Sequence, residues 1–208
     1  EEAERALGEL DGGEALLFAS GAAASAAAIL GLLAPGNKVA LAEGAYYGSG
    51  ALLRELARWG VEHVEFDQTV SPPADAELVW LEAPSNPFLT MPDFEAAAAH
   101  GAPVLCDSTA ATPLNVKPLE LGCDIVLHSA TKYLAGHDDA LLGAVVCKSP
   151  EDAARLLEFR SRTGPVPAAD TAWLLLRGLE TLEVRVTRQS LTAAALAERL
   201  DQHPLVGV

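Results

Sequence analysis

Basic residues are scarce in this sequence. The 208 residues include 14 Lys and Arg against 29 Asp and Glu, so the formal net charge is −15. Binding to a nucleic-acid backbone requires a basic surface, and we therefore expect no nucleic-acid partner. Anionic membrane surfaces also attract basic segments, so we expect no membrane partner either.

Cysteine and aromatic residues are also few. The three cysteines, Cys106, Cys123 and Cys147, are too few and too scattered to form a disulfide scaffold or a metal site. No secretory signal is recognisable, which together with the odd cysteine count favours a reducing, cytoplasmic location. We expect all three thiols to be buried among apolar side chains.

One uncharged stretch has the length of a membrane span. Residues 15–35 carry no charge over about 20 positions, which is the length needed to cross a bilayer. The stretch is mostly alanine, however, and Ser20, Gly21, Ser25 and Gly31 interrupt it. This weakly apolar composition favours a helix packed inside a large α/β protein over a helix facing lipid.

Short apolar runs alternate with helical patterns along the chain. This alternation predicts an α/β fold with a mostly parallel sheet and helices on both faces, in three α/β/α layers. The chain opens in a charged helix, EEAERALGEL. Strands are expected at 39–42, 61–66, 78–80, 104–106, 125–127 and 144–147. Helices are expected at 21–33, about 50–59, about 92–100 and 150–162, with one long amphipathic helix over about 168–201.

Polar side chains follow several of the expected strands. Ligands of open α/β sheets bind at the carboxyl ends of the strands, so these loops are expected to meet at one pocket. The loops are APSNP at 83–87, DST at 107–109, HSATKY at 128–133, YYGS at 46–49, and Ser20-Gly21 before the first alanine-rich helix.

The chemistry of this set fits one known cofactor, pyridoxal phosphate. Lys132 stands among hydroxyl groups with no acidic residue within five positions, and such a lysine can react as an amine with an aldehyde. The hydroxyls of Ser129 and Thr131, with amides at the helix beginning near Gly21, would suit a phosphate. Asp107 could hold a protonated ring nitrogen, which this cofactor needs to act as an electron sink.

Six segments together resemble the cystathionine γ-synthase/γ-lyase family, the Cys/Met metabolism enzymes that depend on pyridoxal phosphate. They occur in the family's order over nearly the whole chain. The resemblance implies the large, cofactor-binding domain of a fold-type I enzyme over residues 1–208. The segments are GELDGGEALLFASGAAA, EGAYYGSGAL, LEAPSNP, CDSTAATP, HSATKYLAGHDDALLGAVV and TAWLLLRGLETLEVRVTRQS.

The resemblance also implies a role for each matching residue. Lys132 would bind the cofactor covalently and later carry protons. Tyr47 would stack on the ring and assist catalysis. Asp107 would pair with the ring nitrogen. Thr109 would lie near the ring, Asn86 would contact its hydroxyl group, and Ser85 with Asn86 would face the substrate carboxylate. The phosphate ligands would be the amides of Gly21 and Ala22 and the hydroxyls of Ser129 and Thr131.

Several of these assignments have a simpler structural alternative. Lys132 could be a solvated surface lysine. Asp107 could cap a helix, Tyr47 could pack in the core, and Asn86 before Pro87 could be a turn residue. Ser129 and Thr131 could also bond only to the nearby backbone. We interpret His128 and His137 as structural histidines, and we expect Arg177, Arg185 and Arg188 on a solvated helix face or at a subunit contact.

Two features of the family have no counterpart in these 208 residues. An N-terminal arm would add a Tyr and an Arg to the phosphate site of a neighbouring subunit, and a C-terminal small domain would add an Arg for the substrate carboxylate. We therefore expect the chain to be a piece of a longer polypeptide. Sharing of sites between subunits implies a homo-oligomer, in this family a dimer of dimers.

The resulting hypothesis is a trans-sulfuration enzyme that acts on cystathionine or a related sulfur amino acid by γ-elimination, as a cystathionine γ-lyase does. The resemblance leaves γ-replacement open, as in cystathionine γ-synthase or O-acyl-homoserine sulfhydrylase. A non-catalytic cofactor-binding member or fragment is a further alternative. A nicotinamide-dependent dehydrogenase is disfavoured because no Gly-x-Gly-x-x-Gly follows a first strand.

Overall fold

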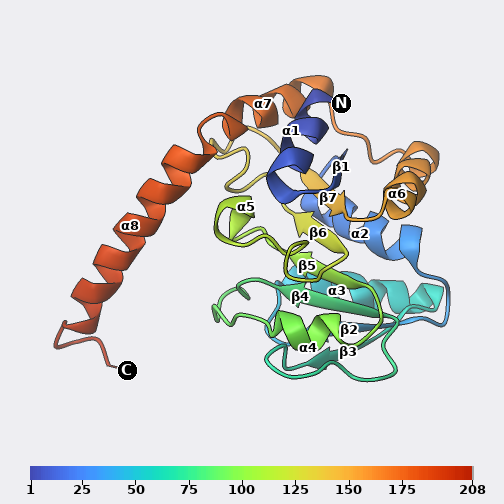
Figure 1. The fold of residues 1–208 in the computed structure, drawn as a ribbon, viewed down its shortest axis with the longest axis horizontal. Coiled ribbons are helices and arrows are strands. Elements are labelled where there is room, and N and C mark those ends of the chain that lie inside the picture. Colours follow the sequence, from blue (N-terminus) through green and yellow to red (C-terminus); the bar gives the residue numbers. More distant parts are fainter. Residues whose placement is uncertain (208) are drawn as a thin grey trace.

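The computed structural model describes residues 1–207 and shows a seven-stranded sheet between layers of helices (Figure 1). The strands are β1 Glu14–Phe18, β2 Lys38–Ala42, β3 Glu62–Phe66, β4 Leu78–Glu82, β5 Val104–Asp107, β6 Ile125–His128 and β7 Gly143–Cys147. The helices are α1 Glu2–Asp11, α2 Gly21–Leu32, α3 Tyr47–Leu56, the 3-10 helix η1 Ala57–Trp59, α4 Phe94–Ala98, α5 Thr112–Asn115, α6 Pro150–Thr163, α7 Ala169–Leu179 and α8 Leu182–Asp201.

The sheet is mixed but mostly parallel, with the strand order β1-β7-β6-β5-β4-β2-β3. The pairs β2–β3, β2–β4, β4–β5 and β5–β6 are parallel. Strand β7 runs antiparallel to both β6 and β1. The prediction of a mostly parallel sheet is confirmed, and the parallel strands bring the ends of β4, β5 and β6 to the same edge.

Both faces of the sheet are covered, which confirms the expected three layers. Alternate residues of β4 show why: Leu78 and Trp80 pack with α2, α3 and α6, whereas Val79 and Leu81 pack on the opposite face, where α4 lies. Helices α1 and α7 cover the β6–β7 part of that opposite face. Strands buried on both sides read as continuous apolar runs, which is how most of them were predicted.

Three elements differ from the sequence-based expectation, and one of them is the short helix α5, which was not predicted. Strand β1 was not predicted, because its apolar residues run directly into the alanine-rich segment without a turn signal. The single helix expected over about 168–201 is two helices, α7 and α8, separated at Glu180–Thr181. At this break the Gly178 carbonyl accepts hydrogen bonds from the Thr181 hydroxyl and from the Arg185 side chain.

The uncharged stretch at 15–35 is strand β1 followed by α2. Within residues 1–207, no helix combines the length and the apolar character needed to cross a membrane. Cys106, Cys123 and Cys147 are free and buried, as predicted. In Figure 1, α8 extends away from the sheet, and its residues after Val186 are exposed.

Gly178 allows α7 to lie directly on the backbone of the segment after β6. A Cβ atom at Gly178 would come within 2.3 Å of the Ala135 carbonyl oxygen. We expect Gly178→Ala to lower the free energy of unfolding by about 1–3 kcal/mol, the usual cost of overpacking. Urea unfolding of the full-length protein would measure this loss.

The matched control is Gly50→Ala within α3. There the nearest atom to a new Cβ is the flexible Arg54 guanidinium Nη1, at 3.2 Å. Replacing a helical glycine by alanine without a clash stabilises a protein by roughly 0.5–1 kcal/mol. Equal effects of the two substitutions would show that the contact between α7 and Ala135 imposes no steric limit.

Candidate active site

A cavity of about 980 Å³ opens where β4, β5 and β6 end. Its size is at the upper end of the range for small-molecule sites, roughly 300–1,000 Å³. All of the predicted site residues line it: Gly21, Ala22, Tyr47, Ser85, Asn86, Asp107, Thr109, Ser129, Thr131 and Lys132.

The N-terminus of α2 forms one wall of the cavity. The Ser20 hydroxyl caps the helix by accepting a hydrogen bond from the Ala23 amide at 3.1 Å. The first amides of a helix have no partner within it, so those of Gly21 and Ala22 are available to an anion. A Cβ atom at Gly21 would come within 2.9 Å of the Ser129 side chain. Glycine at this position therefore lets the helix amides and the Ser129 hydroxyl meet at one point.

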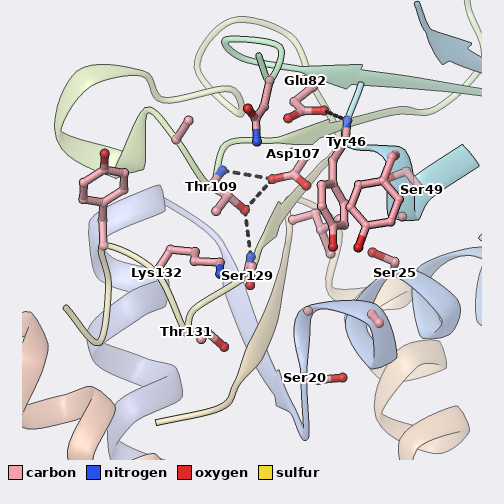
Figure 2. A pocket seen from close by; sticks show the side chains of 18 of the residues that line it. Ser20, Ser25, Tyr46, Ser49, Glu82, Asp107, Thr109, Ser129, Thr131 and Lys132 are labelled. Atoms are coloured by element: carbon pink, nitrogen blue, oxygen red, sulfur yellow. Dashed lines mark hydrogen bonds between the residues drawn. The ribbon is translucent and has the colours of Figure 1, made fainter. Parts of the chain in front are cut away.

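Asp107 ends β5 and is bound to the loop beyond β6 through Thr109 (Figure 2). Asp107 Oδ1 accepts hydrogen bonds from the Thr109 hydroxyl at 2.5 Å and from the Thr109 amide at 2.9 Å. The Thr109 hydroxyl in turn accepts one from the Ser129 amide at 2.8 Å. These bonds fix the carboxyl group at the edge of the cavity.

Burial raises the pKa of Asp107, although the Thr109 bonds and the nearby His128 offset part of that rise. Burial disfavours an isolated charge, and a cationic partner would restore the ionised form. Asp107 is therefore suited to bind a protonated nitrogen in the cavity.

The Ser129 and Thr131 hydroxyls, which are the two predicted to bind phosphate, differ in their hydrogen bonds within the protein. The Thr131 hydroxyl donates to the Leu142 carbonyl at 3.1 Å and accepts from the Leu142 amide at 3.0 Å. A threonine hydroxyl has one hydrogen, so Thr131 would have to leave the carbonyl to donate to a phosphate. Ser129 requires no such rearrangement and is the better placed donor.

Lys132 lies in a turn that follows β6. Its amide donates to the Ser129 carbonyl at 3.0 Å, and its carbonyl accepts from Gly136 at 2.8 Å. Arg185 of α8 closes this turn from outside, donating to the Tyr133 carbonyl at 2.8 Å. The Arg185 guanidinium thus lies against backbone carbonyls of its own chain, and the expected subunit contact of this arginine stays a prediction.

Tyr46 and Tyr47 stand at the start of α3, beside the cavity. Their ring centroids are 4.7 Å apart, with the planes tilted by 57°. The hydrogen bond to Tyr47, with some burial, raises the pKa of Tyr46. Tyr47 is 77% exposed, so it is not a core residue.

Among the residues that line the cavity, sequence reasoning did not single out Glu82, Arg185 and Gln189. Glu82 had a usable signal, since it ends the apolar run LVWLE as Asp107 ends VLCD. Arg185 and Gln189 had none, because α8 is distant in sequence from the loops they join. Ala110 and Asp138 also line the cavity.

His128 is structural, as interpreted from the sequence, and forms a buried pair with Asp11. His128 Nε2 lies 3.0 Å from Asp11 Oδ2, and neither side chain is accessible to solvent. Burial lowers the His128 pKa, but the Asp11 charge and hydrogen bond, Asp107 and the Ser108 backbone outweigh it, and the net pKa is raised.

We expect Asp11→Asn to lower the free energy of unfolding by about 3 kcal/mol at pH 6, since breaking a buried pair leaves an uncompensated charge. A raised histidine pKa stabilises the fold below the unfolded value of about 6.5, and this contribution is lost as pH rises through the folded value. The loss should therefore shrink by about pH 9. Urea unfolding at both pH values measures it, with the exposed Asp201→Asn as control. An equal loss of unfolding free energy at pH 6 and pH 9 would mean that His128 is not charged in its pair with Asp11.

Relatives of known structure or name share this architecture. The chain is 39% identical to the cystathionine beta-lyase MetC of Bacillus subtilis, over 98% of the chain and 55% of that protein. It superimposes on the cystathionine gamma lyase CalE6 of Micromonospora echinospora with a TM-score of 0.93 and 39% identity, covering 100% of the chain and 58% of that protein. A putative O-acetylhomoserine (thiol)-lyase of Campylobacter jejuni, crystallised with a pyridoxyl-lysine phosphate, gives a TM-score of 0.91 at 28% identity over 97% of the chain and 61% of that protein.

The cavity has the donor set that pyridoxal phosphate requires. The amides at the start of α2 and the Ser129 hydroxyl suit the phosphate, the buried Asp107 carboxyl suits the ring nitrogen, and Lys132 supplies an amine. Within the described residues, no cluster of His, Cys, Asp and Glu could hold a metal ion.

The match to known proteins extends along the whole chain. The model of the Cys/Met metabolism PLP-dependent enzymes matches residues 1–208. The chain spans about half the length of the curated relatives, 55% of MetC and 53% of a Mycobacterium tuberculosis cystathionine gamma-synthase. The family predicted from the six segments is confirmed: the chain belongs to the Cys/Met metabolism family of pyridoxal-phosphate-dependent enzymes.

Proposed function

We propose that the protein is a trans-sulfuration enzyme that cleaves cystathionine or a related sulfur amino acid by γ-elimination, and that residues 1–208 form its cofactor-binding large domain. The observation that carries this proposal is that Lys132 and Tyr47 line the same cavity as Asp107. The Lys132 amine and the Tyr47 phenol would lie beside a cofactor ring bound by the Asp107 carboxyl. These two groups can carry out the proton transfers that γ-elimination needs.

Each part of the bound molecules would have its own protein groups. The Gly21 and Ala22 amides and the Ser129 hydroxyl, with Thr131 after rearrangement, would hold the phosphate. Asp107, oriented by Thr109, would hold the ring nitrogen, and Asn86 would contact the ring hydroxyl. Ser85 and Asn86 would face the substrate carboxylate. When bound, pyridoxal phosphate withdraws the electrons released at the substrate α-carbon.

Lys132 and Tyr47 move the protons. Lys132 accepts the α-proton of the substrate and later a second proton from the β-carbon, and a proton returns to the γ-carbon after the sulfur has left. The bond between the γ-carbon and sulfur then breaks, and the departing cysteine thiolate takes a proton, for which Tyr47 is the donor. Addition of water to the remaining four-carbon fragment gives 2-oxobutanoate and ammonia. The balance is cystathionine and water to cysteine, 2-oxobutanoate and ammonia.

Product analysis of the full-length protein with cystathionine tests the proposal. Cysteine with 2-oxobutanoate supports γ-elimination, which is the activity in the name of CalE6. Homocysteine with pyruvate would instead show the β-elimination named for MetC. Formation of cystathionine from an O-acyl-homoserine and cysteine, without elimination, would show γ-replacement. Bound cofactor without turnover of either substrate would indicate a non-catalytic member.

We also propose that the full-length protein is a homo-oligomer, with a dimer of dimers as the expected state. The exposure of Tyr47, at 77%, supports this, because a residue that stacks on a cofactor is normally shielded from water. Light scattering of the full-length protein measures the mass. A fully active monomer would contradict the proposal.

A further inference from the structure

Glu82 is a second carboxyl group in the cavity that the proposed chemistry does not use. It ends β4, and in the parallel β4–β5 ladder its Cα is paired with that of Asp107. Residues paired in this way on neighbouring strands point to the same face of the sheet. Figure 2 shows the Glu82 and Asp107 carboxyl groups near each other, beside Tyr46. Glu82 is 6% exposed and Asp107 is 9% exposed, so both are buried.

The position of Glu82 is fixed from two sides. Its Oε2 atom accepts a hydrogen bond from the Tyr46 amide at 2.5 Å, and that amide belongs to the residue that caps α3. Its backbone is held by buried Gln68, which donates to the Glu82 carbonyl at 2.9 Å and accepts from the Glu82 amide at 3.1 Å. The carboxyl group therefore joins the end of β4 to the residue that precedes Tyr47.

The titratable group that faces Glu82 across the β4–β5 ladder is the Asp107 carboxyl. The neighbouring Cys106 thiol lies in the apolar cluster on the opposite face of the sheet. Helix α3 and the loop after β4 present backbone amides, those of Tyr46 and Asn86. Burial first, and then the charge of Asp107, raise the pKa of Glu82 to about 7, although the two amides oppose the rise. Two buried carboxyl groups side by side do not both ionise readily.

A cation bound by Asp107 would change this balance. It would offset the negative charge that disfavours ionisation of Glu82. The carboxylate formed would also lie at the N-terminus of the ten-residue helix α3, where negative charge is favoured. Its bond to the Tyr46 amide would then be charge-assisted, which makes such bonds stronger.

We propose that Glu82 is a positioning residue that releases its proton when Asp107 binds the cationic ring nitrogen of the cofactor, and that its carboxylate then holds the start of α3, with Tyr47, against the cavity. The proposal goes beyond the elimination chemistry but rests on the assignment of Asp107 to the ring nitrogen. Glu82 acts on the cofactor through Asp107 and Tyr47 and exchanges no proton with the substrate.

The test compares the affinity of the full-length apoprotein for pyridoxal phosphate in wild type and Glu82→Gln, by equilibrium dialysis between about pH 6 and pH 8. Glutamine has the shape of protonated glutamate and keeps an acceptor for the Tyr46 amide, but it cannot ionise. If cofactor binding lowers the Glu82 pKa by about one unit, the variant binds about twofold more weakly at pH 6 and about tenfold more weakly at pH 8. A purely structural role would weaken binding equally at every pH.

The matched control is Glu43→Gln. Glu43 follows β2 as Glu82 ends β4, but it is exposed and does not line the cavity. The affinity of the Glu43→Gln variant for pyridoxal phosphate should equal that of wild type at every pH. If Glu82→Gln is also parallel to wild type at all pH values, whether equal or uniformly weaker, the proposal is overturned.

A second measurement counts protons directly and does not depend on turnover. Calorimetry of cofactor binding near pH 7 in buffers of different ionisation enthalpy should show about 0.4 more protons released by wild type than by Glu82→Gln. In an Asp107→Asn background the same substitution should make no difference to proton release. If wild type forms product normally but wild type and Glu82→Gln release equal numbers of protons, only the inference about Glu82 is overturned. Absence of cofactor binding by wild type would instead overturn the proposed function.

Discussion

Replacing Lys132 with alanine is expected to lower turnover by about 10³-fold or more, because general acid–base catalysis by one positioned group contributes about 10²–10⁴-fold and Lys132 also supplies the covalent attachment. Lys132 is the one lysine that lines the cavity within the described part of the chain. The measurement is the rate of 2-oxobutanoate formation, together with the visible absorbance of the bound cofactor before and after borohydride reduction.

Two controls separate this effect from misfolding. Lys117→Ala removes an exposed lysine that pairs with Glu120 on the surface, and it should leave the rate and the spectrum unchanged. Lys132→Arg keeps a positive charge but cannot bond covalently to an aldehyde, so it should resemble Lys132→Ala. Recovery of cofactor covalently fixed by borohydride in Lys132→Ala would show that another amine holds it, and the assignment would be wrong.

The framework of this fold could be predicted because most of its strands are buried on both faces. The runs at 78–80, 104–106, 125–127 and 144–147 are continuous and apolar, and all became strands of the sheet. Strand β1 was not predicted from its apolar pattern. Its apolar residues run directly into α2, and its position at the edge of the sheet results from pairing with β7, which is distant in sequence. A pairing over such a separation leaves no local pattern.

The candidate site was likewise predictable only where the sequence carries a local signal. Residues in loops directly after strands were identified, because the topology of a parallel sheet brings those loops together. The place of Arg185 beside the cavity was not predicted, because it depends on the break between α7 and α8 and on contacts with the Gly178 and Tyr133 carbonyls. These are tertiary contacts, and helical periodicity alone predicts a continuous helix.

Asp107→Asn is expected to lower turnover by between about 10² and 10⁴-fold while the cofactor remains attached to Lys132. Removing one partner of a buried charged pair costs roughly 3–5 kcal/mol, and each 1.36 kcal/mol corresponds to a tenfold change in rate. The amide introduced has the same shape as the carboxyl group and keeps an oxygen for the Thr109 bonds. It carries no charge, however, and so does not favour a protonated ring nitrogen.

The contrast with the Lys132 variant identifies the role of Asp107. Loss of the lysine should remove both the covalent cofactor and the activity, whereas Asp107→Asn should keep the borohydride-fixed cofactor and lose only the rate. Thr109→Val removes the hydroxyl that orients Asp107 and donates to it at 2.5 Å, but leaves the charge. It should therefore cost less, about tenfold, in line with one hydrogen bond to a charged group. If Thr109→Val costs as much as Asp107→Asn, then Asp107 acts through its fixed position in the loop network and not through its charge.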